Sequence, residues 1–245
     1  MRIYPLARAA EVAREYAKVM ADAPDQLCGG LAFVSAPPAP FVPPELVGQP
    51  VLATVVLWAG PSEQADAGVA PLAALGQPAI DLVTDMPYVA VQQLFDAAYP
   101  YGQLREYMTS GFLDELAGDS IDAFVEAAAG FLSPLTAVIL QPLGGAYGRV
   151  AEDATPLARR DAAWAYQLLS VWGNSSEDDA HRGWTRTLNA RLQRHGQPSS
   201  FPNFVADIAP GALRHAYPTA TLERLQAAKI AWDPTNVFCN NHSLF

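Results

Sequence analysis

The sequence lacks the features of several large classes of protein. Lys and Arg account for 15 of its 245 residues against 25 Asp and Glu, so its formal charge is −10. Because affinity for nucleic acid comes mostly from clustered Lys and Arg, this balance argues against a nucleic-acid partner. No apolar run reaches the ~18 residues of a membrane span, and the first residues lack a secretory signal pattern. We therefore expect a cytoplasmic protein without a membrane partner.

Cysteine and histidine are also scarce. Cys28 and Cys239 are the only two cysteines, too few for a disulfide framework and too far apart for a metal-binding pair. We expect each to be a small buried apolar residue. The four histidines show no HxxxH or HExxH spacing, so no metal site is predicted. They are His181, His195, His215 and His242.

The short motifs that mark many active sites are missing. The sequence has no GxSxG turn, which supplies the nucleophile of an α/β-hydrolase triad. It has no GxxxxGKS or GxxxxGKT loop, and no GxGxxG segment after a predicted strand. A cofactor-free hydrolase, a phosphate-binding loop and a Rossmann dinucleotide site therefore have no supporting motif.

What the sequence does contain is enough apolar material for a substantial core. Hydrophobic residues make up 51% of the chain and charged residues 16%, so it forms one large domain or two small ones. Apolar periodicity predicts helices and strands, and the proline-rich segment 37–50 is predicted to be an exposed loop. Helices are predicted over 6–20, 62–75, 89–98, 119–131, 175–194 and 219–231, and extended segments over 31–36, 51–60, 104–116, 136–150, 164–173 and 200–208.

The order of these elements indicates the fold class. Several neighbouring predicted strands have no helix between them, whereas parallel strands need a crossover connection that is usually helical. The pattern therefore predicts an α+β fold with an antiparallel β-sheet flanked by helices. The residue pattern by itself indicates no function beyond this fold class.

The last part of the chain carries a more specific pattern. Asn203 and Phe204 lie in the segment SFPNFVADI, and a predicted helix then leads into DPTNVFCNNHSLF. These pieces resemble the C-terminal signature of berberine bridge enzyme-like FAD-linked oxidases, a YxN segment followed by a helix and DPxNxFxxNQ. Upstream, 105–116 and 143–150 are similar to the substrate-binding region of that family. The second piece matches at Asp233, Pro234, Asn236, Phe238, Asn241 and Ser243, with His242 in place of the glutamine.

This resemblance implies an architecture and a chemistry. It implies a substrate-binding α+β domain over 1–198 and a C-terminal berberine-bridge-like segment over 199–245, which packs on a flavin domain. FAD is the implied cofactor, and it accepts hydride from a small organic substrate. The family's RGGGH-type flavin loop has no counterpart in this sequence, so the chain alone is not expected to hold FAD. The expected partner is a flavin-binding domain in cis or in trans.

The same resemblance assigns candidate site residues. Asn203, Phe204 and Asn241 are the expected flavin contacts, because side-chain amides can bind the polar rim of the ring and an aromatic ring can wall it. Tyr107 and Gln141 are expected to form a substrate wall on the concave face of the sheet.

One departure from the family leaves an alternative open. Phe201 stands where the family has a tyrosine base, and phenylalanine has no ionisable group. Tyr107 is a candidate replacement for that base, with Tyr147 and Tyr166 as further choices. The departure equally suits a non-catalytic small-molecule-binding or interaction domain derived from such an oxidase. Core packing explains Phe201, and an asparagine-rich turn explains 236–241, without any flavin.

The resemblance also predicts a surface property. A tail that packs on a separate flavin domain leaves apolar side chains exposed when that domain is not present. We expect this exposure over NVFCNNHSLF and around Phe201, with self-association as its consequence.

Overall fold

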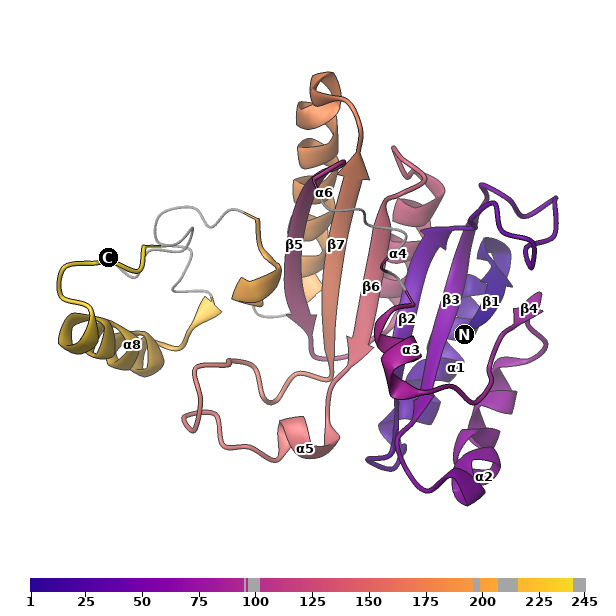
Figure 1. Ribbon diagram of the computed structural model, residues 1–245, viewed down its shortest axis with the longest axis horizontal. Helices are drawn as coiled ribbons and strands as arrows, with labels where there is room; N and C mark the ends of the chain where they lie inside the picture. The colour runs from indigo at the N-terminus through magenta and orange to yellow at the C-terminus, as the bar shows by residue number, and fades with distance from the viewer. Residues whose placement is uncertain (95, 97–101, 196–198, 207–215, 240–245) are drawn as a thin grey trace.

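A single antiparallel sheet organises the molecule. The computed structural model describes residues 1–94, 96, 102–195, 199–206 and 216–239. Within them the sheet has seven strands in the order β4-β1-β3-β2-β6-β7-β5, and every pairing between them is antiparallel (Figure 1). The strands are β1 (Arg2–Pro5), β2 (Leu27–Ser35), β3 (Pro50–Trp58), β4 (Ile80–Asp81), β5 (Arg105–Leu113), β6 (Ala137–Pro142) and β7 (Trp164–Trp172).

Three helices cover one face of this sheet. They are α1 (Ala9–Ala21), α4 (Gly118–Ala129) and α6 (Asp178–Leu192), which lie behind the strands in Figure 1. Each is amphipathic, so its apolar stripe packs against the sheet and forms the main core. In the described residues, the other helices are α2 (Ala65–Val69), α3 (Tyr88–Gln92), α5 (Gly145–Gly148), α8 (Thr219–Trp232) and 3-10 turns at Leu6–Arg8, Ser62–Gln64, Ala70–Leu75, Ser175–Glu177, Gln193–His195 and Pro202–Phe204.

The centre of the core is aromatic. Phe124 of α4 is fully buried, and its ring stacks on Phe33 of β2 with centroids 6.1 Å apart. Tyr166 of β7 packs against the same ring at 6.2 Å and donates a 2.8 Å hydrogen bond to Oδ1 of Asn189 in α6. The predicted α+β fold with an antiparallel sheet and helices packed on it is confirmed.

On the opposite face of the sheet, a described loop covers the β1–β3 side. The proline-rich segment 37–50 is confirmed as a loop between two strands, and its Val42 packs on Ile3, Val51 and Ala53. This cluster covers the β1–β3 side. We call the remaining part, the face of β2, β6, β7 and β5 opposite α1, α4 and α6, the open face. Ala137, Leu169 and Val171 form a small buried cluster on it.

Several element predictions needed correction. The first α-helix begins at Ala9, later than predicted, because Leu6–Arg8 forms a 3-10 turn, and the preceding strand β1 was not predicted. The strand predicted over 136–150 ends at Pro142. The segment 62–75 is a chain of short helical turns. The described part of 200–208 contains a 3-10 turn rather than a strand, and 207 and 208 lie outside the described residues. The helix predicted over 89–98 is limited to Tyr88–Gln92, and 95, 97 and 98 lie outside the described residues.

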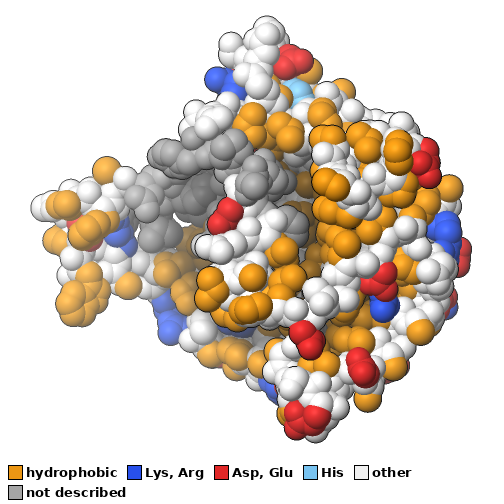
Figure 2. All heavy atoms as spheres, turned by 45° about the vertical axis from the view of Figure 1, so that its right-hand side comes forward, with side chains coloured by type: hydrophobic (Ala, Val, Ile, Leu, Met, Phe, Trp, Pro, Cys, Tyr) orange, Lys and Arg blue, Asp and Glu red, His pale blue; other side chains and the backbone are white. Residues whose placement is uncertain are grey.

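The C-terminal part of the described chain, 216–239, forms an arm that projects from the sheet (Figure 1). Its helix α8 has one buried residue, Thr221, and Arg224 ties it to the body through a 2.8 Å hydrogen bond to the carbonyl of Asp153. Figure 2 shows hydrophobic side chains on this projecting arm. Val237 is 71% exposed and Phe238 79% exposed, so the expected apolar surface of the tail is confirmed over these residues.

Both cysteines are exposed, so the prediction that they are buried was wrong. Cys28 follows Leu27 on β2, and successive side chains of a strand point to opposite faces. Leu27 enters the core, which turns Cys28 away from it. Separately, none of the helices in the described part of the chain is long and apolar enough to cross a membrane.

Candidate functional site

The open face carries a polar strip across three strands. The strand register aligns Ser110 of β5, Gln167 of β7 and Ile139 of β6 in one row. The next row contains Phe112 of β5, Ala165 of β7 and Gln141 of β6. Residues paired across antiparallel strands point to the same face, so both glutamines and the serine lie together.

The two glutamines form an amide pair. Nε2 of Gln167 donates a 3.3 Å hydrogen bond to Oε1 of Gln141. Each amide retains hydrogen-bonding capacity beyond this bond, because a glutamine carries two N–H donors and a carbonyl acceptor. The structure therefore places Gln141 on the open face together with Gln167. Side chains alternate between the two faces along β7, and Tyr166, the neighbour of Gln167, is buried in the core. From the sequence, this alternation could have located Gln167 on the opposite face.

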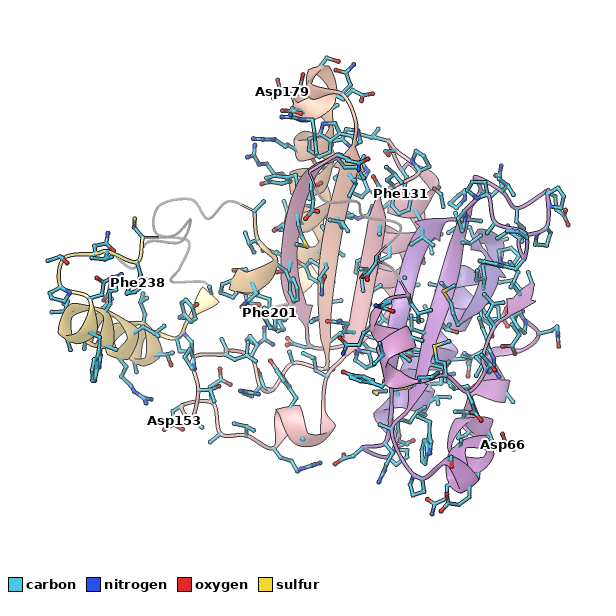
Figure 3. All side chains as sticks on the ribbon, viewed as in Figure 1. Asp66, Phe131, Asp153, Asp179, Phe201 and Phe238 are labelled. Atoms are coloured by element: carbon cyan, nitrogen blue, oxygen red, sulfur yellow. The ribbon has the colours of Figure 1, made fainter. Side chains whose placement is uncertain are left out.

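An aromatic wall borders this strip. The ring of Phe112 stacks on Phe201 with centroids 5.9 Å apart, and Phe201 packs on Phe204 at 5.0 Å. Figure 3 shows Phe201 beside β5. Ser110 holds Phe201 twice, because its Oγ accepts from the Phe201 N–H at 3.1 Å and donates to the Phe201 carbonyl at 3.0 Å. The Ala206 N–H continues this edge contact by donating to the Met108 carbonyl at 2.8 Å.

Tyr107 lies on the other side of the sheet. Its side chain is buried, its hydroxyl accepts a 3.1 Å hydrogen bond from Nε of Arg186, and the Arg182 guanidinium lies 5.7 Å from its ring centre. Both arginines belong to α6, so Tyr107 faces the helices. The expectation that Tyr107 shares the concave face with Gln141 was wrong, and Tyr107 is not part of the substrate wall or a base at the open face.

The two other tyrosine candidates are also held by protein partners. Tyr166 is buried under α4 and α6, and burial raises the pKa of its hydroxyl. The Tyr147 hydroxyl donates to the carbonyls of Ala158 and Arg159 at 3.1 and 3.2 Å, and partial burial raises its pKa as well. A raised pKa keeps both phenols protonated near neutral pH, so neither is poised as a base.

The structure describes two of the three candidate flavin contacts, Asn203 and Phe204. Asn203 is exposed in the 3-10 turn Pro202–Phe204, and Phe204 belongs to the aromatic wall. Asn241 lies outside the described residues.

The Asp-Pro motif after α8 folds into a closed turn. The carboxylate of Asp233 accepts backbone N–H bonds from Val237 at 2.7 Å and Phe238 at 3.0 Å, and it pairs with Lys229. Nζ of Lys229 also donates to the carbonyl of Phe238 at 2.7 Å. The lysine hydrogen bond holds the pKa of Asp233 below its ordinary value. The turn therefore directs Val237 and Phe238 outward by hydrogen bonds within the arm itself.

The geometry suits one half of a site for a flat aromatic ring. An aromatic wall on the edge strand β5 lies one strand away from an amide pair on β7 and β6, which offers apolar contact and directional hydrogen bonds on one face. The fit to FAD is limited to the ring, because no glycine loop for its diphosphate occurs in the sequence. In the described ranges, no group of three or more His, Cys, Asp or Glu is arranged to hold a metal ion.

Comparisons with known proteins identify relatives of the chain. Residues 200–244 match the family model "Berberine and berberine like". The chain is 30% identical over 189 residues to the uncharacterized FAD-linked oxidoreductase YgaK of Bacillus subtilis, covering 74% of this chain and 40% of that protein.

Solved structures show the same fold. The berberine bridge enzyme-like protein 28 of Arabidopsis thaliana superimposes with a TM-score of 0.79 at 17% identity, over 99% of this chain and 55% of that one. The wild-type berberine bridge enzyme-like protein 1 of Physcomitrella patens gives a TM-score of 0.78 at 16% identity, over 100% and 53%.

Fold and relatives together place the chain among the FAD-linked oxidoreductases. Within that class, it belongs to the berberine bridge enzyme-like family. The chain spans about half the length of the relatives that it matches.

Proposed function

We propose that this chain supplies the substrate-binding wall of an FAD-dependent oxidoreductase, which oxidises a small organic molecule by hydride transfer to the flavin. The flavin is held by a flavin-binding domain in cis or in trans. The observation that supports this proposal is the junction on one sheet face between two features, the Gln141–Gln167 amide pair and, one strand away, the Phe112–Phe201 wall. Phe201 of that wall belongs to the segment matched by the family model.

Each part of the junction has a role in this proposal. Gln141 and Gln167 orient the substrate through their remaining donors and acceptors. Phe201 and Phe204 form an apolar wall at the edge of the flavin ring, and the exposed amide of Asn203 binds its polar rim. FAD, when bound, supplies the two-electron acceptor. Since Phe201 carries no ionisable group, this chain binds and orients the substrate but takes no proton at that position.

An absorption spectrum tests the cofactor part of the proposal. The chain is expressed alone and then together with the flavin-binding half of a berberine bridge enzyme-like relative. We expect flavin absorption bands in the purified complex and none in the chain alone. A chain that stays colourless and uncomplexed in both preparations would refute the proposal.

Substitution of the amide pair tests the substrate part. In the flavin-loaded complex, Gln167→Ala is expected to raise KM for an oxidised substrate by about tenfold, because one directional hydrogen bond is lost. Gln64→Ala is the matched control, since Gln64 is an exposed glutamine outside the open face. Equal kinetics of the two variants would contradict the assigned role.

A second candidate function is a non-catalytic small-molecule-binding or interaction domain derived from such an oxidase. The phenylalanine at 201, in place of the family's tyrosine, favours it. The same experiments separate the two functions. A chain that binds a small apolar ligand at the open face, in a complex that never reduces its flavin, has the second function.

A further inference from the structure

Arg159 is an unusual residue in the loop before β7. It is 8% exposed although the loop around it is largely open to solvent, and its φ is +60°. A residue with a Cβ rarely adopts this left-handed conformation, so contacts made by the residue must hold it there.

The side chain of Arg159 joins three separate parts of the chain. It pairs with Asp114 just after β5, and its Nε donates to Oδ1 of Asp161 at 3.0 Å. Its Nη1 donates to Oγ of Ser199 at 3.4 Å. Its guanidinium carbon also lies 6.0 Å from the ring centre of Phe112. The backbone N–H is held too, because it donates to Oε1 of Glu152 at 2.9 Å.

The contact with Ser199 connects Arg159 to the start of the C-terminal segment. Ser199 lies two residues before Phe201, and the Phe201 ring stacks on Phe112, the ring that the Arg159 guanidinium faces. On the other side, Ser110 fixes the Phe201 backbone. The start of the C-terminal segment is thus attached to the sheet edge at two neighbouring points, one charged and one neutral.

We infer that Arg159 is a positioning residue that fixes the segment 199–206 on the edge of β5 and so holds Phe201 against the open face. The left-handed backbone turns the guanidinium inward to reach β5 and Ser199 at once. The role of Phe201 as a wall of the substrate site rests on the proposed function, whereas the attachment of 199–206 to β5 does not.

Hydrogen exchange of the full chain, without flavin, tests the attachment. Arg159→Gly removes the side chain and keeps the φ of +60°, since glycine adopts that conformation freely. Loss of hydrogen bonds to a charged group is expected to speed exchange in the peptide 199–206 by about tenfold. Peptides from β6 and β7 are expected to exchange as in the unsubstituted chain. Arg159→Lys keeps the charge and is expected to recover part of the protection.

The matched control is Arg149→Ala. Arg149 also forms a two-pronged pair with a carboxylate, that of Asp25, but it lies on the surface away from the segment. We expect no change of exchange in 199–206. If Arg159→Gly does not fold, Ser199→Ala removes the same link from the other side and is expected to speed exchange by about threefold.

Two results would overturn the inference. One is unchanged exchange over 199–206 in a folded Arg159→Gly or Ser199→Ala variant. The other is a rise of similar size throughout β6 and β7, which would make Arg159 a general stabilising residue. Because the experiment contains no flavin, its failure leaves the proposed function untouched, and a colourless complex leaves this inference untouched.

Discussion

The exposed end of the C-terminal arm leads to a prediction about association. Trp232 is 89% exposed and Phe238 79% exposed, and the turn closed by Asp233 and Lys229 holds them at the same end of α8. Large apolar side chains in such positions associate with other apolar surfaces in water. We expect the chain, in the absence of a flavin-binding domain, to self-associate through this end.

The size of the effect follows from the burial of those two rings. Complete burial of one large apolar side chain contributes about 1.5–3 kcal/mol, so two contribute about 3–6 kcal/mol. Contacts in a loose dimer bury only part of each ring. Even ~2 kcal/mol corresponds to roughly a 30-fold change in the dissociation constant. The double variant Trp232→Ser with Phe238→Ser is therefore expected to dissociate at concentrations where the unsubstituted chain is associated.

Sedimentation velocity over a range of concentrations measures this change. The control is Tyr88→Ser with Val89→Ser, which removes two apolar side chains that are 69% and 67% exposed on α3. It is expected to associate as the unsubstituted chain does. The reasoning is refuted if the unsubstituted chain is monomeric at high concentration, or if both double variants weaken association equally.

Three further changes have expected effects on stability, each measured by urea unfolding. Phe124→Ala removes the ring between Phe33 and Tyr166 and is expected to lower the free energy of unfolding by about 3–5 kcal/mol; a loss below ~1 kcal/mol would contradict the central place of this ring. Tyr166→Phe removes the hydrogen bond to Asn189 and is expected to cost about 1 kcal/mol, whereas an unchanged midpoint would mean that the bond contributes nothing. The Arg105 hydrogen bond lowers the pKa of Asp178 in the folded chain, so its stabilising contribution is present at neutral pH and is lost as the pH falls below about 4. Asp178→Asn is expected to be less stable at pH 7 and to lose less stability on acidification; a parallel loss in both proteins would show that the pair is not responsible.

Much of the fold was predictable because its main elements are long and regular. Strands β3, β5 and β7 have nine residues each, and their apolar and β-prone sequences are sufficient to locate them. Strands β1 and β4 have only four and two residues. Elements that short show too little periodicity, and their pairing with β3 and with each other stabilises them instead.

The candidate site was less predictable because its contacts join distant parts of the chain. Phe201 and Ser110 are 91 positions apart, and Arg159 and Asp114 are 45 apart. The C-terminal pattern located Phe201 and Phe204, but no local pattern shows which strand edge receives them. For the same reason no sequence pattern indicates Arg159, whose importance arises from three partners brought together by the fold.

The misplacement of Tyr107 shows what limits a prediction of sheet faces. Tyr107 pairs with Ser170 of β7, and Gln141 pairs with Ala165 of the same strand. Paired residues share a face, while side chains along a strand alternate, so an odd separation on β7 puts the two candidates on opposite faces. Alternation within each strand is visible in the sequence, but the register between strands is not. A register shifted by one residue would have placed Tyr107 on the same face as Gln141, so the pairing of the strands decides which side chains share a face.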